Sequence, residues 1–158
     1  MEGLNDRMND AQHEFRRGRS TESAWARVKD YVRMSESKYV LEVFVDFKSA
    51  FDNLEWMRVI EKLREIGCEE MSLWKSYFQG RRACMVGVND VAWKKVERGC
   101  PQGSICGLFI WNLMMDELLW KLDECGCKCV AYADDLLLIV EGQSRVEIER
   151  KGTDPSSM

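Results

Sequence analysis

The hydrophobic positions of residues 20–80 predict three helices and one strand. Ser20 and Thr21 open a helical pattern whose apolar face carries Ala24, Trp25, Val28, Tyr31 and Val32. The run from Tyr39 to Phe47 is rich in β-formers and predicts a strand that ends on Asp46. Two amphipathic segments follow, and Gly67 and Gly80 are expected to end them. Their inward positions are Trp56, Val59, Ile60, Leu63 and Ile66 in the first, and Met71, Trp74, Tyr77 and Phe78 in the second.

The second half of the chain predicts two hairpins separated by a long helix. Residues 82–88 and 91–96 have strand character and would turn at Asn89-Asp90. A loop over residues 99–104 then leads into an amphipathic helix that runs to about Cys125. Its expected core face is Leu108, Trp111, Met115, Leu118, Leu119 and Leu122. Ser144 and Glu147 have capping-box spacing and predict a last helix, whereas the polar residues 1–13 predict a frayed leader.

The apolar run Val130–Val140 is broken at its centre by Asp134 and Asp135. Because Asp tolerates the backbone conformations of tight turns, the run is interpreted as strand, Asp134-Asp135 turn, strand. Two adjacent carboxylates in apolar surroundings repel each other and lose hydration, so a compensating cation is expected. The alternative at this point is an ordinary surface hairpin with an acidic turn.

Composition predicts a soluble, intracellular chain of at most one domain. The 158 residues are 46% hydrophobic, and no apolar stretch is long enough to span a membrane. A net charge of −4 is a poor match to nucleic-acid binding, for which a basic surface is expected. Contact with a polyanion would therefore depend on local clusters such as Arg16, Arg17 and Arg19, which could equally form a solvated charged loop.

The seven cysteines are odd in number and scattered, which fits reduced thiols in a nuclear or cytoplasmic compartment. Cys125, Cys127 and Cys129 follow a Cys-x-Cys-x-Cys spacing, which differs from the Cys-x₂-Cys pairs of structural zinc sites. We therefore expect packing residues and no structural zinc.

Three stretches place unusual residues at the ends of predicted elements. A lone acid, Asp46, ends a buried strand, and Gly103 and Gly107 flank a helix start where backbone can approach a phosphate. With Asp134 and Asp135, the chain would offer three carboxylates from neighbouring strand ends. Such a set could hold two Mg²⁺ ions, which prefer oxygen ligands and phosphates, for phosphoryl transfer.

In this order the motifs resemble those of reverse transcriptases from non-LTR (LINE-like) retrotransposons, most closely the arthropod type-1 elements that insert into ribosomal DNA. The stretch 44–52 (FVDFKSAFD) is similar to motif A, 98–104 (RGCPQGS) to motif B and 132–135 (YADD) to motif C. Gln12 and residues 15–21 resemble the preceding fingers motif. The resemblance covers about residues 12–145.

The resemblance implies a role for each matching position. Asp46, Asp134 and Asp135 would be the catalytic carboxylates that bind two Mg²⁺ ions, with Mn²⁺ as an alternative. Phe51 would exclude a 2′-hydroxyl by filling its space. The expected nucleotide-binding residues are Phe47, Phe51, Gln102 and Gly103, and the expected template-binding residues are Arg16, Arg17 and Arg19. The implied partners are an RNA template, a DNA primer and deoxynucleoside triphosphates.

The implied fold is α+β, a polymerase palm with a small antiparallel sheet backed by helices. Residues 1–38 would be a partial fingers segment, 39–143 the palm and 144–158 a truncated tail, with the thumb absent. Two positions depart from the family pattern, since Glu14 replaces a glycine and Leu108 a proline.

The implied function is RNA-directed DNA polymerisation by two-metal nucleotidyl transfer. Without a thumb to hold the duplex, we expect weak or no processive synthesis. The alternatives are an inert transposon remnant, or an RNA-binding or interaction module that keeps the palm for its shape.

Overall fold

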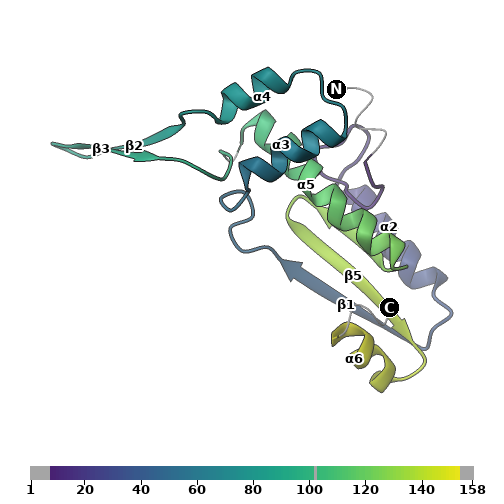
Figure 1. The fold of residues 1–158 in the computed structure, drawn as a ribbon. Helices are drawn as coiled ribbons and strands as arrows, with labels where there is room; N and C mark the ends of the chain where they lie inside the picture. Colours follow the sequence, from purple (N-terminus) through teal and green to yellow (C-terminus); the bar gives the residue numbers. More distant parts are fainter. Residues whose placement is uncertain (1–7, 102, 154–158) are drawn as a thin grey trace. The chain divides into compact units, whose positions relative to one another are not determined.

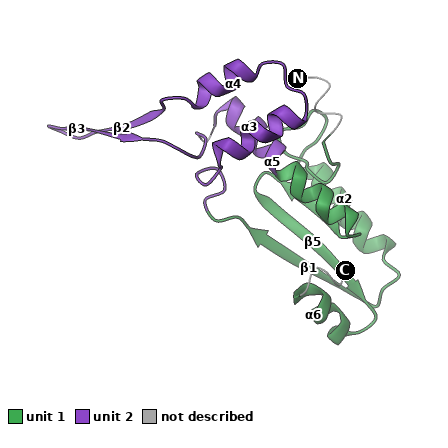
Figure 2. Ribbon diagram, in the orientation of Figure 1, with its two compact units in different colours: residues 1–48, 115–158 green, residues 49–114 purple. Residues whose placement is uncertain are grey.

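A computed structural model describes residues 8–101 and 103–153, which form two compact units. Unit 1 comprises residues 1–48 and 115–158, and unit 2 comprises residues 49–114 (Figures 1 and 2). Helices and small antiparallel sheets make up the described chain, which confirms the α+β class. Within that part, no helix has the length and apolar character needed to cross a membrane.

Unit 1 is built on a three-stranded antiparallel sheet. Its strands are β1 (Tyr39–Asp46), β4 (Lys128–Tyr132) and β5 (Asp135–Gly142), in the order β1-β5-β4. The central strand β5 is paired along its whole length with β1, from Asp135 opposite Asp46 to Gly142 opposite Tyr39. It is also the most buried strand, because both its faces carry apolar side chains.

Helix α2 (Thr21–Met34) covers one face of this sheet. Ser20 caps its first turn, since the Ser20 hydroxyl accepts a hydrogen bond from the Ser23 backbone N–H. Every third or fourth residue of the helix then reaches the sheet, where Val28 packs with Val130, Leu137 and Ile139. The last helix, α6 (Arg145–Thr153), packs against β1 and β5. Ser144 caps it as the sequence predicts.

Unit 2 contains helices α3 (Trp56–Glu65) and α4 (Met71–Phe78) and the start of α5 (Ile105–Glu124), which continues into unit 1. The three helical segments of this unit are joined by an aromatic cluster. The Trp74 ring stacks on Phe109 with centroids 5.6 Å apart, and Trp56 stacks on Phe78 at 5.2 Å. The strands β2 (Arg82–Val86) and β3 (Val91–Lys95) form a separate hairpin that extends away from these helices (Figure 2).

The loop before α5 is fastened to the turn before α3, also within unit 2. The Gly99 N–H donates to Leu54 O at 2.7 Å, and the Trp56 indole N–H donates to Gly99 O at 2.7 Å. A Cβ atom on Gly99 would lie 2.8 Å from the Asp52 carbonyl oxygen, and its φ of +82° is left-handed. Glycine is therefore required here on both steric and conformational grounds.

Several expectations need correction. The prediction of a frayed leader is wrong for residues 8–13, because Ala11, Gln12 and His13 are buried beside β4. Trp25 is 59% exposed although it shares the predicted helix face. In α5 the buried surface is wider than predicted and includes Ile110 and Leu113.

The two hairpins also differ from expectation at their turns. The β2–β3 hairpin pairs Val86 with Val91, so that its loop is residues 87–90 rather than Asn89-Asp90 alone. Gly87 N–H closes this loop by donating to Asp90 O at 2.7 Å. The β4–β5 turn is Ala133-Asp134 rather than Asp134-Asp135, since Tyr132 pairs with Asp135.

The Gly99 contact can be separated from simple backbone strain by comparing two alanine variants. We expect Gly99→Ala to lower the free energy of unfolding more than Gly67→Ala, although both glycines have positive φ. Strain alone costs roughly 1–3 kcal/mol. Only Gly99→Ala adds a clash with backbone, because a Cβ on Gly67 has nothing within 4 Å. Urea unfolding of the two variants measures the difference, and equal destabilisation would contradict the proposed tight contact.

Candidate active site

The three predicted carboxylates lie at the same end of the unit 1 sheet. Asp46 is the last residue of β1 and stands directly opposite Asp135, the first residue of β5. Directly paired residues of antiparallel strands point to the same face, with Cβ atoms about 5 Å apart. Asp134 precedes Asp135 in the turn from β4, so the chain brings all three together by strand pairing alone.

The turn that presents Asp134 is strained at the residue before it. Ala133 has a φ of +55°, in the left-handed region that side chains with a Cβ disfavour. The sequence interpretation assigned this conformation to an aspartate, but the register places Ala133 first in the two-residue turn. Strained backbone of this kind costs about 1–3 kcal/mol and is common at functional sites.

The donor set fits a divalent cation such as Mg²⁺ or Mn²⁺. Carboxylate oxygens are the ligands these ions prefer, and two like charges opposite each other are destabilising unless a cation compensates them. Within residues 8–101 and 103–153, no three acidic, histidine or cysteine side chains are already arranged to hold a metal ion. Asp46 and Asp135 are exposed, so they can reach a shared ion by changing rotamer.

Residues 11–13 support the acidic turn from the outer side of β4. The Ala131 N–H donates to Ala11 O at 2.8 Å, and the His13 N–H donates to Ala131 O at 2.9 Å. The Gln12 side-chain amide donates to Ala133 O at 3.2 Å and so fastens the strained residue itself. The segment resembling a fingers motif therefore holds the hairpin that carries Asp134.

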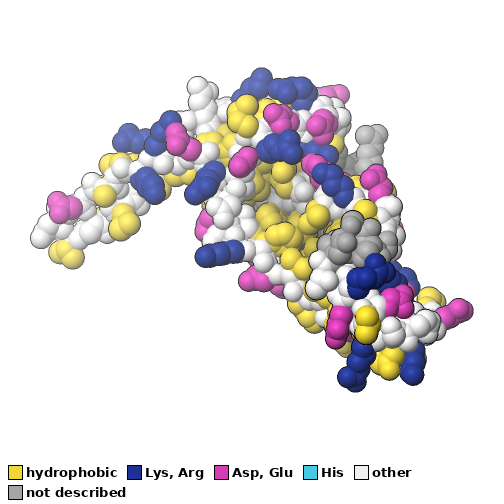
Figure 3. Space-filling model, turned by 60° about the horizontal axis from the view of Figure 1, so that its bottom comes forward, with side chains coloured by type: hydrophobic (Ala, Val, Ile, Leu, Met, Phe, Trp, Pro, Cys, Tyr) yellow, Lys and Arg dark blue, Asp and Glu magenta, His cyan; other side chains and the backbone are white. Residues whose placement is uncertain are grey.

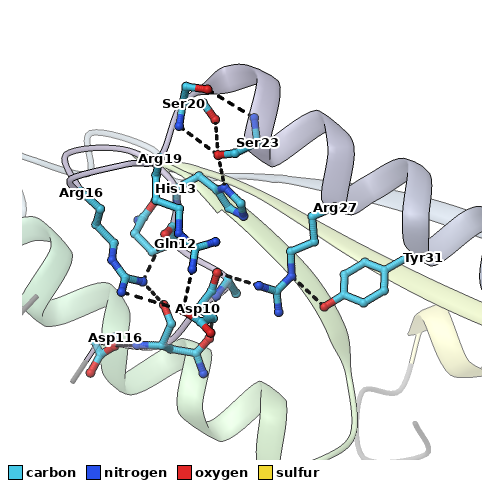
Figure 4. A network of polar contacts seen from close by, with 12 residues as sticks. Asp10, Gln12, His13, Arg16, Arg19, Ser20, Ser23, Arg27, Tyr31 and Asp116 are labelled. Atoms are coloured by element: carbon cyan, nitrogen blue, oxygen red, sulfur yellow. Dashed lines mark hydrogen bonds and ion pairs between the residues drawn. The ribbon is translucent and has the colours of Figure 1, made fainter. Parts of the chain in front are cut away.

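A polar network connects this support to the predicted template arginines (Figure 4). Arg16 donates to Asn9 O at 2.7 Å, and Arg19 donates to the Asp10 carboxylate at 2.6 Å. Arg27 donates to Asp10 O at 2.8 Å. The Arg16 side chain is 8% exposed, so a solvated loop is the wrong description of that residue. Arg17 is the exposed member of the predicted set.

Glu14 adds a fourth acid near the turn. Burial raises the pKa of its carboxyl, and the charges of Asp134 and Asp135 raise that pKa further. The sequence identified Glu14 only as a departure from the family's glycine and did not connect it with the carboxylates. The signal available was this departure alone.

The predicted nucleotide-binding residues are divided between the units. Phe47 follows Asp46 in unit 1, whereas Phe51 and Gly103 belong to unit 2. The Phe51 ring packs on Trp111 with centroids 5.2 Å apart, and its carbonyl accepts the Cys100 N–H. Gly103 is exposed and has a φ of +78°. Gln102 lies outside the described residues.

An apolar hollow of about 260 Å³ borders Asp135 between α2 and the sheet. Trp25 and Phe44 are among its walls and remain largely exposed there, which explains why the predicted apolar face of α2 is only partly buried.

Cys127 and Cys129 are buried, as packing residues would be, whereas Cys125 is exposed. Burial raises the pKa of the Cys129 thiol to about 12, which keeps it protonated.

Comparisons with known proteins agree with the resemblance to reverse transcriptases. Residues 1–152 match the family model described as reverse transcriptase (RNA-dependent DNA polymerase). Over 89% of its length the chain is 52% identical to a putative 115 kDa protein in type-1 retrotransposable element R1DM of Drosophila melanogaster. Over 90% it is 45% identical to a retrovirus-related Pol polyprotein from type-1 retrotransposable element R1 of Bradysia coprophila.

A more distant match is the probable RNA-directed DNA polymerase from transposon BS of Drosophila melanogaster, 28% identical over 82% of this chain. The chain spans 14% of the length of each of the two R1 relatives. These matches do not favour an inert remnant or a binding module.

The buried His13 predicts a measurable pH dependence of stability. Burial, together with the charges of Arg19, Arg27 and Arg16, lowers the pKa of His13 from 6.5 to about 4, and the charge of Asp10 opposes this shift only in part. Between pH 6.5 and about pH 4, His13 is protonated in the unfolded state but neutral in the folded state. The free energy of unfolding therefore falls as the pH falls.

From pH 7 to pH 5, His13 should account for a loss of about 2 kcal/mol in the free energy of unfolding. Urea unfolding at both pH values should show this loss in the wild type and a smaller loss in His13→Gln. The same pH dependence in both proteins would refute the assignment of a neutral buried His13.

Proposed function

Because the chain belongs to the reverse transcriptase (RNA-dependent DNA polymerase) family, we propose that it carries the polymerase's metal-binding carboxylates and part of its nucleotide site. The observation that carries the proposal is the pairing of Asp46 with Asp135 beside Asp134 in the turn. The family transfers nucleotidyl groups, and the substrates proposed are an RNA template, a DNA primer and deoxynucleoside triphosphates.

In this proposal Asp46, Asp134 and Asp135 hold two divalent cations. The bound ions would lower the pKa of the attacking primer hydroxyl and neutralise charge on the leaving pyrophosphate. The protein's part is positioning, since misplacement by about 1 Å can cost roughly 100-fold in rate. Paired strands fix Asp46 and Asp135, while Gln12 fixes the turn backbone next to Asp134.

The nucleotide-binding role is proposed residue by residue, for Phe47 in unit 1 and for Phe51, Gln102 and Gly103 in unit 2. Phe51 is proposed to exclude a 2′-hydroxyl, a role that needs a rigid ring, and its packing on Trp111 restricts its motion. Phe47, Gln102 and Gly103 are proposed as the other nucleotide-binding residues. The N-terminus of α5, which begins at Ile105 just after Gly103, is proposed to face a phosphate, because helix N-termini favour anions and glycine leaves space beside it.

Residues 39–143 are proposed as palm and residues 1–38 as partial fingers. In this assignment the fingers segment has a supporting role as well as a binding role. Arg16 binds the Asn9 carbonyl and Arg19 binds the Asp10 carboxylate. Arg17 is exposed and is therefore the best placed of the three to contact template phosphate.

Single-nucleotide extension of a DNA primer on an RNA template tests the proposal. We expect Mg²⁺-dependent incorporation by the wild-type chain, and a loss of about 100-fold or more in Asp134→Asn, since transition-state charge would lose a stabilising partner. Glu42→Gln is the matched control, because it removes a carboxylate from β1 that pairs with Ile139 rather than with an acid. Incorporation by Asp134→Asn at the wild-type rate would reject the proposed site, as would no incorporation by folded wild type.

A further inference from the structure

The β2–β3 hairpin leaves both of its faces exposed. Every residue of the two strands is exposed, including large apolar side chains that a folded chain normally buries. Among them, Met85 is 76% exposed, Val86 73% and Trp93 58%. A two-stranded hairpin is at best marginally stable on its own, so such a surface indicates a ligand.

The strand register sorts the side chains of this hairpin into two different faces. Arg82 pairs with Lys95, and Cys84 pairs with Trp93, so these four share one face. Lys94 pairs with Ala83 and lies on the opposite face. The Arg82 guanidinium lies 5.2 Å from the centre of the Trp93 ring, so that cationic and aromatic groups adjoin each other.

Like charges that face each other across a strand pair are destabilising unless something compensates them. Arg82 and Lys95 form such a pair. Lys95 also contacts Glu97 at 2.6 Å, but both side chains of that ion pair are more than 70% exposed, so it is weak and exchangeable. An anion between Arg82 and Lys95 would offset the repulsion that remains.

The charge of the segment favours a polyanion over a protein surface. Residues 81–98 contain five basic and two acidic residues, a net charge of +3 in a chain whose net charge is −4. Figure 3 shows basic and hydrophobic side chains interspersed along the hairpin. Residues 94–98 also line an open hollow of about 540 Å³.

We propose that this hairpin binds single-stranded nucleic acid, with Trp93 stacking on an unpaired base and Arg82 and Lys95 contacting the adjacent phosphates. Aromatic side chains next to basic ones are the usual means of holding single strands without sequence preference. The inference deepens the proposed function by assigning a strand contact outside the carboxylate site. It rests on that function only for identifying the strand as template.

The test is fluorescence anisotropy of a labelled 12-nucleotide RNA with the full 158-residue chain, without divalent ions or deoxynucleotides. Trp93→Leu should weaken binding by about 5-fold or more, because stacking on a base is lost. Trp93→Tyr should retain most of the affinity. The matched control is Trp120→Leu, which removes another exposed tryptophan (45%) and should leave the affinity unchanged.

Two neighbouring lysines test the assignment of the face. Lys95→Ser should weaken binding and make the slope of log K against log salt shallower by about 0.7, as expected for one lost phosphate contact to a single strand. Lys94→Ser removes the same charge from the other face and should change the slope less. Equal effects of the two variants would overturn the face-specific contact.

Other outcomes also decide the proposal. If Trp93→Leu loses the same affinity for the single-stranded RNA and for its fully paired duplex, stacking of Trp93 on an unpaired base is overturned. Unchanged RNA affinity with altered self-association would assign the hairpin to protein contacts instead. Asp134→Asn should bind RNA as the wild type does, so that failure of the polymerase site and failure of this inference give different results.

Discussion

The simultaneous pairing of β5 with β1 and β4 is the constraint on which the candidate active site depends. Pairing with β1 places Asp46 opposite Asp135, and pairing with β4 fixes the two-residue turn that contains Asp134. A slip of one residue would move every β5 side chain to the other face of the sheet. The packing of Leu137 and Ile139 with Val28 of α2 therefore helps to set the position of the carboxylates.

The arrangement of the acidic residues at this end of the sheet lowers the stability of the fold. Two like charges are paired, Ala133 has a positive φ, and Glu14 lies close enough for the charges of Asp134 and Asp135 to raise its pKa. Hydrogen bonds from residues 11–13 to β4 and its turn offset part of this cost. A site that binds cations and phosphates is expected to concentrate unfavourable charge when the ligands are absent.

Local patterns in the sequence predicted most elements of the fold. The strand ending on Asp46 and the helix beginning after Ser20 follow from alternation and from capping chemistry, which act within a few residues. The positions of Asp46, Asp134 and Asp135 at one end of a sheet were also accessible, because each lies at a recognisable strand end. Their catalytic role remains a prediction.

Features that depend on distant segments could not be predicted in the same way. The burial of Gln12 and His13 arises from bonds to β4, more than a hundred residues later in the chain. Turn propensity predicted a turn at Asp134-Asp135, but the pairing of β4 with β5 places the two turn residues at Ala133-Asp134. The face shared by Arg82, Trp93 and Lys95 likewise appears only when the strands are paired.

The central claim is that strand pairing in unit 1 assembles a divalent-cation site. Electron paramagnetic resonance of Mn²⁺, titrated with the protein, tests it most directly because bound and free ions give different signals. The account predicts that wild type and Glu42→Gln bind Mn²⁺, and that Asp46→Asn binds about tenfold or more weakly, since affinity follows the number of carboxylate ligands. Equal Mn²⁺ affinity in the wild type and Asp46→Asn would contradict it.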